Sequence, residues 1–155
     1  MERAEGLEQT GILEKTVPNV IVQFKELYRN LSHLPVDRFA LVYADNIIFR
    51  DPVHELRGAA DVLGYLETLC ERVEFCQFEY LDELIGDDKA YIKWNMNFRH
   101  PSLGKEVHSV RGMSHIEFTD RIHYHEDVYD LGEMLYEHIP VLGSATRFLK
   151  RRLAA

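Results

Sequence analysis

Three ionisable residues carry the chemistry that this sequence offers: Asp51, directly before Pro52, and His125 and Asp127, two positions apart in a stretch typical of a β-strand. A carboxylate in an apolar cavity loses hydration, which raises its pKa and makes it a better base near neutral pH. We therefore expect Asp51 to take a proton next to a carbonyl group. Residues two apart on a strand share a face. His125 and Asp127 are thus expected to orient each other, with His125 as acid or as donor to the developing enolate oxygen.

Each of these residues also has a purely structural interpretation. Asp-Pro is a common start of a turn, so Asp51 can instead be a turn or cap residue. The His125–Asp127 pair can be a buried structural hydrogen bond, or it can face solvent. A further interpretation adds His123, because two histidines and a carboxylate form a metal-ligand set. Successive ligands along one strand face are about 6.6 Å apart, however, too far for one ion unless the strand bends, and we expect no metal.

The first half of the sequence is mostly helical. Apolar residues recur at helical spacing over residues 20–31 and 59–73. Pro35 fits the first turn of a second, short helix that continues to Tyr43. A short strand, residues 47–49, is closed by Asp51 and Pro52.

In the second half of the sequence the pattern changes to the two-residue alternation that is typical of β-strands. Four segments are rich in aromatic and β-branched residues, and the turns between them are short enough to require antiparallel neighbours; they are 74–85, 91–99, 107–118 and 122–129. A closing helix is expected over residues 142–153. Helices followed by a meander predict an α+β fold, in which a long curved sheet with helices on one face forms a cone. Side chains or a ligand must fill its hollow.

A family resemblance agrees with this order of elements. The sequence YADNIIFRDP at residues 43–52, with Gly58 after it, resembles a segment typical of the nuclear transport factor 2-like superfamily, in particular its ketosteroid isomerases and SnoaL-like polyketide cyclases. Residues 111–118 and 122–130 match a second segment, and the resemblance covers residues 18–138. It implies the cone-shaped, cystatin-like fold, with three N-terminal helices packed on a curved antiparallel sheet. That fold hosts enzymes, binders and interaction modules alike.

The resemblance also implies roles for single residues. Asp51 falls where ketosteroid isomerases keep their catalytic base, which works beside an oxyanion hole of a tyrosine and a protonated aspartate. Neither partner carries over. Leu27 stands at the tyrosine position, with Tyr28 one residue away on another helical face, and Ser114 stands at the second acid position. A true ketosteroid isomerase is therefore not expected.

Strand alternation and the resemblance together predict a pocket. Alternation alone does not decide which face of the last strand points inward, but the resemblance places His125 and Asp127 there. A few polar groups in an apolar, aromatic cavity are typical of a small-molecule site. Around Asp51, His125 and Asp127 we expect the following lining residues: Tyr65, Trp94, Met96, Phe98, Ser114 and Tyr129.

Composition limits the setting and the partners. Asp and Glu (26) outnumber Lys and Arg (18), and the net charge of −8 argues against a nucleic-acid partner. The expected boundaries are a flexible segment at 1–17, a domain at 18–141 and a basic helix at 142–155, whose contact with a membrane is not expected. Cys70 and Cys76 fit free thiols of a reducing cytoplasm, and the polar, acidic start is unlike a signal peptide.

These observations predict a cytoplasmic protein with a pocket for a small hydrophobic molecule, without a cofactor. The leading interpretation is an acid/base isomerase, cyclase or hydratase that acts on an apolar carbonyl compound. The alternative is a non-catalytic module of the same fold that binds a ligand or a protein partner. A homodimer through the outer sheet face is also expected, because outward residues such as Tyr91 and Met113 give that face a mixed character.

Overall fold

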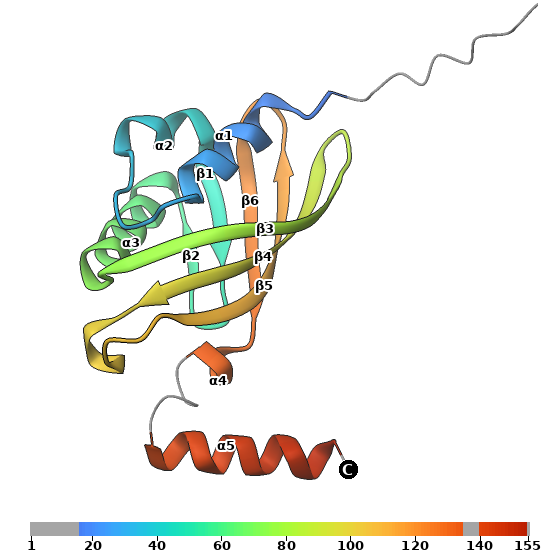
Figure 1. Ribbon diagram of the computed structural model, residues 1–155. Coiled ribbons are helices and arrows are strands. Elements are labelled where there is room, and N and C mark those ends of the chain that lie inside the picture. The colour runs from blue at the N-terminus through green and yellow to red at the C-terminus, as the bar shows by residue number, and fades with distance from the viewer. Residues whose placement is uncertain (1–15, 135–139, 155) are drawn as a thin grey trace, which may run out of the picture.

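A curved sheet with helices packed on one face forms the main body of the chain (Figure 1). The computed structural model describes residues 16–134 and 140–154, without the side chains of 140 and 141. The elements occur in this order: α1 (Asn19–Tyr28), α2 (Val36–Val42), β1 (Tyr43–Arg50), β2 (Glu55–Arg57), α3 (Ala59–Arg72), β3 (Phe75–Ile85), β4 (Lys89–Arg99), the 3-10 turn η1 (Pro101–Leu103), β5 (His108–Phe118), β6 (Ile122–Tyr129), α4 (Leu131–Met134) and α5 (Pro140–Leu153).

The sheet has the strand order β2-β1-β6-β5-β4-β3. The α+β fold and the antiparallel meander from β3 to β6 are confirmed. The pairing of β1 with β6 is parallel and was not predicted. Parallel neighbours need a long connection, and the chain between these two strands supplies one. Tyr43 was also misplaced, because it begins β1 instead of ending α2.

The helices cover the inner face of the sheet with their apolar sides. α1 buries Val20, Phe24 and Leu27, which recur every three or four residues. α3 begins after Gly58, whose φ of 92° is a conformation that glycine adopts without strain. No helix of the described residues is long and apolar enough to cross a membrane.

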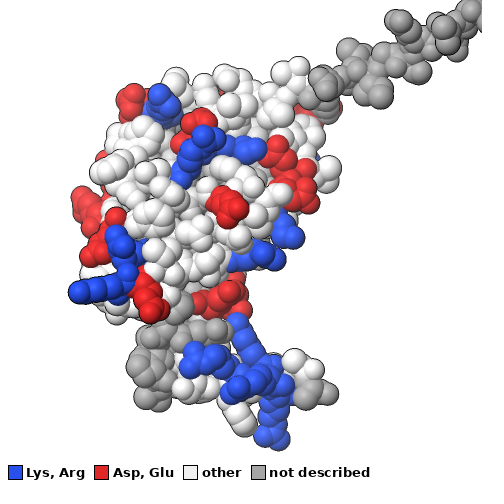
Figure 2. All heavy atoms as spheres, in the orientation of Figure 1, with Lys and Arg blue, Asp and Glu red and all other residues white. Residues whose placement is uncertain are grey.

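α5 lies next to α4, at the end of β6 (Figure 1). It starts at Pro140, two residues before the predicted boundary. Its Lys150 forms an ion pair with Asp130, and Lys and Arg side chains gather on this helix (Figure 2). Most of the predicted N-terminal segment, residues 1–15, lies outside the described residues.

The outer sheet face exposes several apolar side chains, among them Tyr91, Met113 and Val128. The Tyr91 ring stacks on His115 with 4.6 Å between ring centroids. The homodimer through this face stays a prediction.

Gly112 of β5 makes room for the largest side chain of the core. A Cβ atom at Gly112 would lie 2.2 Å from the Trp94 ring, and Trp94 is almost completely buried. The flat ring of Trp94 can lie across β5 only because residue 112 has no side chain.

We expect Gly112→Ala to lower the free energy of unfolding by about 1–3 kcal/mol, because the added methyl group overpacks the core. Gly64→Ala in α3 is the matched control, since nothing lies within 4 Å of its added Cβ. It should raise the same free energy by about 0.5–1 kcal/mol, because alanine favours helices. Urea unfolding followed by Trp94 fluorescence measures both. Equal changes in the free energy of unfolding of the two variants would contradict the close packing of Trp94 on Gly112.

Candidate functional site

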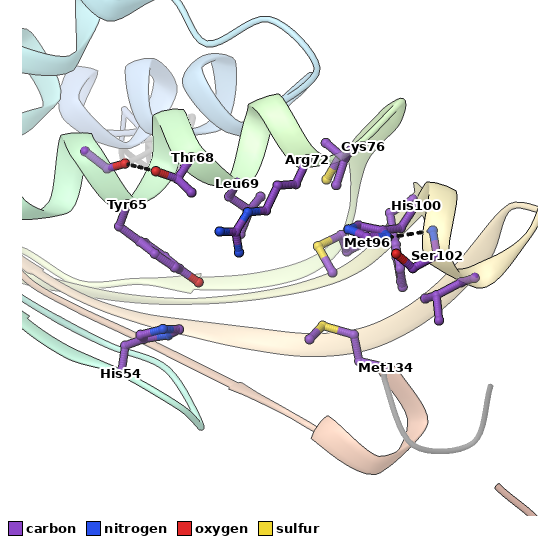
Figure 3. A pocket seen from close by; sticks show the side chains of 14 residues that line it. His54, Tyr65, Thr68, Leu69, Arg72, Cys76, Met96, His100, Ser102 and Met134 are labelled. Atoms are coloured by element: carbon purple, nitrogen blue, oxygen red, sulfur yellow. Dashed lines mark hydrogen bonds between the residues drawn. The ribbon is translucent and has the colours of Figure 1, made fainter. Parts of the chain in front are cut away.

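A cavity of about 610 Å³ lies between α3 and strands β3 and β4, with η1 and α4 completing its wall (Figure 3). Its lining is mostly apolar. One face of α3 contributes residues at helical spacing: Gly64, Tyr65, Thr68, Leu69 and Arg72. The sheet, the short elements and the connecting loops contribute the remaining residues: His54, Val73, Cys76, Met96, Phe98, His100, Ser102, Leu103 and Met134. Burial raises the pKa of Cys76 to about 12, so its thiol stays protonated.

The structure places three of the six predicted lining residues at this cavity and the other three elsewhere. Tyr65, Met96 and Phe98 line the cavity, whereas the following do not: Trp94, Ser114 and Tyr129. Trp94 lies deeper in the core, where its ring covers Gly112. Its Nε1 donates to Ser114 Oγ at 2.9 Å, so this pair belongs to the packed interior.

Asp51 is held by several hydrogen-bond donors at once. Its Oδ1 accepts from the backbone N–H groups of Val53 (2.7 Å) and His54 (2.6 Å), and its Oδ2 accepts from the Tyr65 hydroxyl (2.7 Å). The side chain is only 2% exposed. Burial alone would raise the pKa of Asp51, but these bonds outweigh it and lower the pKa below its ordinary value. The expected rise in the pKa of Asp51 is therefore wrong, and the carboxylate orients its neighbours.

His54 is the residue that the sequence reasoning missed. Its Nδ1 lies 3.1 Å from both carboxylate oxygens of Asp51. Because Asp51 is ionised, Nδ1 carries the proton and donates it, which leaves Nε2 as a proton acceptor. The side chain lines the cavity and is 41% exposed. A histidine oriented by a carboxylate is a common arrangement for general acid–base catalysis. The order Asp-Pro-Val-His was the available signal.

A second histidine, His125, is buried in the core with both ring nitrogens bonded. It is 0% exposed. Its Nδ1 lies 2.8 Å from the Tyr43 hydroxyl, which in turn lies 2.8 Å from the Tyr28 hydroxyl. Burial raises the pKa of both tyrosines, so both hydroxyls keep their protons. With Tyr28 donating to Tyr43, and Tyr43 donating to Nδ1, every group in this series is satisfied and Nε2 carries the remaining proton.

The series ends at Asp127. Its Oδ1 accepts from His125 Nε2 at 2.8 Å and from the Ser114 hydroxyl at 2.5 Å. Oδ2 has no hydrogen-bond donor among the described residues, and the side chain is 12% exposed. Ser114 of β5 thus fixes a carboxylate on the next strand.

Asp51 directly follows β1, and Asp127 lies on the neighbouring strand β6. The register that pairs Phe49 with His125 and Arg50 with Glu126 brings Asp51 beside Asp127 one step further on. Burial raises the pKa of Tyr129, and the negative charges of both carboxylates raise it further. The negative charges of Asp51 and Asp127 therefore both act on the hydroxyl groups of Tyr65 and Tyr129.

His123 does not join this group. The pairing of β5 with β6 shifts register between Glu117 and Phe118, which leaves His123 as an extra residue. It lies 3.9 Å from Glu117, and the bulge places His125 on the inner face. A bulge that re-aims side chains is the reason why simple alternation could not assign this strand. Within the described residues, no three acidic, histidine or cysteine side chains gather as a metal site.

Comparisons with known proteins agree with this architecture. Residues 24–125 match the SnoaL-like domain, and the chain belongs to that family. A protein with a ketosteroid isomerase-like fold from Catenulispora acidiphila, in complex with trimethylamine, is 14% identical with a TM-score of 0.67 over 77% of this chain and 92% of its own. A candidate SnoaL-like polyketide cyclase from Shewanella putrefaciens is 15% identical, with a TM-score of 0.65 and coverage of 77% and 95%. A candidate isomerase from Rhodopseudomonas palustris is 16% identical, with a TM-score of 0.66 and coverage of 77% and 96%. No curated protein matches the sequence.

Tyr43→Phe should lower the free energy of unfolding by about 1–3 kcal/mol, because it leaves both the Tyr28 hydroxyl and His125 Nδ1 without a partner. Tyr28→Phe is the matched control. It removes one hydrogen bond but leaves Tyr43 able to donate to His125, so about 0.5–1.5 kcal/mol is expected. Chemical unfolding of the two variants tests the order. A larger loss of unfolding free energy for Tyr28→Phe than for Tyr43→Phe would contradict the assigned directions of these hydrogen bonds.

Asp51→Asn should lower the free energy of unfolding at neutral pH by about 1–3 kcal/mol, because its charge-assisted bonds are lost. A depressed pKa stabilises the fold above the ordinary carboxyl pKa of about 4, and this contribution is lost as the pH falls through the folded-state value. The difference between wild type and variant should therefore shrink in acid. Asp45→Asn, with a side chain 94% exposed, is the control and should change stability by less than about 1 kcal/mol. Thermal unfolding from pH 7 to pH 3 measures both; an unchanged melting temperature for Asp51→Asn would contradict the assignment.

Proposed function

We propose that this chain binds a small, mostly apolar carbonyl compound in the cavity and catalyses a proton transfer on it. Isomerisation, cyclisation and hydration all contain such a step. One observation carries the proposal: His54, oriented by Asp51, presents an imidazole to a mostly apolar cavity. No cofactor is required for this chemistry.

His54 Nε2 is the proposed base that removes a proton from the carbon next to the carbonyl group. Asp51 holds the ring through Nδ1 and stabilises the imidazolium that forms. Tyr65 donates to the same carboxylate, and burial together with that bond raises its pKa, so its hydroxyl stays protonated. The Tyr65 and His54 rings are in contact, with centroids 4.7 Å apart, which limits the orientations of the imidazole.

Asp127 lies outside the residues that line the cavity, but it is the second candidate for the base, because its Oδ2 accepts no bond from the described residues while Oδ1 is fixed. His125 then acts as a positioning residue, since both of its nitrogens are occupied and it lies outside the cavity lining. The SnoaL-like family and its candidate cyclase and isomerase neighbours support proton-transfer chemistry of this kind.

The rival function is binding without catalysis. It is favoured by Leu27 and Ser114, which replace the oxyanion partners of ketosteroid isomerases. In that case His54 and Asp51 would only shape the opening of the cavity, and the ligand would leave unchanged.

Exchange of α-protons for deuterium distinguishes these functions. Proton NMR of apolar ketones such as 2-tetralone in D₂O should show exchange catalysed by the wild type, and His54→Gln should slow it by about 10²–10⁴-fold, as expected for loss of a general base. A loss in Asp127→Asn with His54→Gln still active would move the base to Asp127. Ketone binding without exchange in the wild type would establish the non-catalytic alternative.

A matched pair of substitutions tests the location of the ligand. Met96 lines the cavity, so Met96→Trp should fill it and weaken ketone binding. Met113 lies on the next strand, β5, and its side chain is exposed on the outer face of the sheet. Met113→Trp should therefore leave ketone binding unchanged. Equal binding in both variants would exclude the cavity as the site.

A further inference from the structure

We propose that the natural ligand of this cavity is an apolar carbonyl compound that also carries an anionic group, a carboxylate, bound at Arg72 and His100. This inference rests on the proposed function, since it assumes that the cavity is the ligand site. It adds the chemical class of the ligand and the end of the cavity at which its charge lies.

The first observation is the charge of the lining. The chain as a whole is acidic, with 26 Asp and Glu against 18 Lys and Arg. The described residues that line the cavity differ: they include one cation, Arg72, and no Asp or Glu. Arg72 is exposed in the ligand-free protein, but a ligand that fills the cavity would take it out of water, which is unfavourable unless the ligand supplies an opposite charge.

Arg72 is the second observation. It lies in the last turn of α3, on the same face as Tyr65, Thr68 and Leu69, and its side chain points into the cavity (Figure 3). No carboxylate of the described residues is paired with it, and the nearby Glu74 is bonded by Arg99 instead. A basic residue at a helix C-terminus is favourable in itself, but that interaction does not require the guanidinium to enter a pocket.

His100, directly before η1, supplies a second donor to the lining. Its Nδ1 accepts the backbone N–H of Ser102 at 3.1 Å, so the proton of the neutral ring lies on Nε2. His54 has the reverse arrangement, because its Nδ1 donates to Asp51 and its Nε2 accepts. Among the nitrogen-bearing side chains of the lining, His54 is thus the acceptor and Arg72 and His100 are the donors.

This division of donors and acceptors fits one kind of ligand. A carboxylate accepts bonds from a guanidinium and an imidazole N–H, and Arg binds it in a bidentate, charge-assisted way. The apolar body of the ligand would lie on Leu69, Met96 and Phe98. Its reactive carbon would then face His54, and the fixed anion would set its direction in the cavity.

A matched pair of fluorescent probes tests the anion site. N-phenyl-1-naphthylamine and 8-anilinonaphthalene-1-sulfonate share one ring system, and only the second carries an anionic group. We expect the wild type to bind the sulfonate about tenfold more tightly than the neutral probe, which corresponds to about 1.4 kcal/mol. Arg72→Gln should remove this preference without changing the affinity for the neutral probe, and Arg72→Lys should restore part of it.

Arg111→Gln is the control for non-specific charge. It changes the net charge by the same amount, but Arg111 lies on the outer sheet face, where it bonds Asn95. It should keep the full preference for the sulfonate. Equal affinity of the wild type for both probes, or equal losses in Arg72→Gln and Arg111→Gln, would overturn the anion site while leaving the apolar cavity in place. If Met96→Trp weakens the binding of neither probe, the cavity is not the binding site, and both proposals fail.

Discussion

The buried imidazole of His125 is the interaction on which the interior depends. Four aromatic rings surround it, with centroid distances of 5.2 Å to Phe24, 5.6 Å to Tyr28, 6.0 Å to Tyr43 and 5.0 Å to Phe49. A polar ring in such surroundings is unfavourable unless both nitrogens are bonded. The end of α1, the start of β1 and the inner face of β6 must therefore meet at one place. A one-residue slip of β6 would turn His125 outward and leave the tyrosine hydroxyls without an acceptor.

This network also explains where the cavity lies. Hydrogen bonds continue from His125 through Asp127 and Ser114 to Trp94, toward the middle of the sheet. Side chains therefore fill that part of the cone. Further along β4, Met96 and Phe98 face α3 without such a network, and the open space lies there. The interior thus combines a polar, packed part that fixes the strands with an apolar, open part whose wall carries His54.

The sequence was sufficient for most of the fold, because helical stripes and strand alternation are local patterns. It predicted α3 to within one residue and the four strands of the meander closely. It failed where the answer depends on distant residues. The parallel partner of β1 is β6, far along the chain, and the bulge at His123 depends on the pairing with β5. His54 was missed because its role depends on a four-residue turn around Asp51, which composition and periodicity do not describe.

Asp51 shows why a position within a fold does not determine the chemistry of the residue there. The family resemblance implied a catalytic base at this place, and burial alone would have raised its pKa. Two backbone N–H groups, a tyrosine hydroxyl and an imidazole instead surround the carboxylate and lower that pKa. A carboxylate that accepts so many bonds is a weak base, because a proton would displace a donor. The same bonds make Asp51 a good anchor for His54. The number of donors around the carboxylate, more than its depth, thus sets the pKa of Asp51.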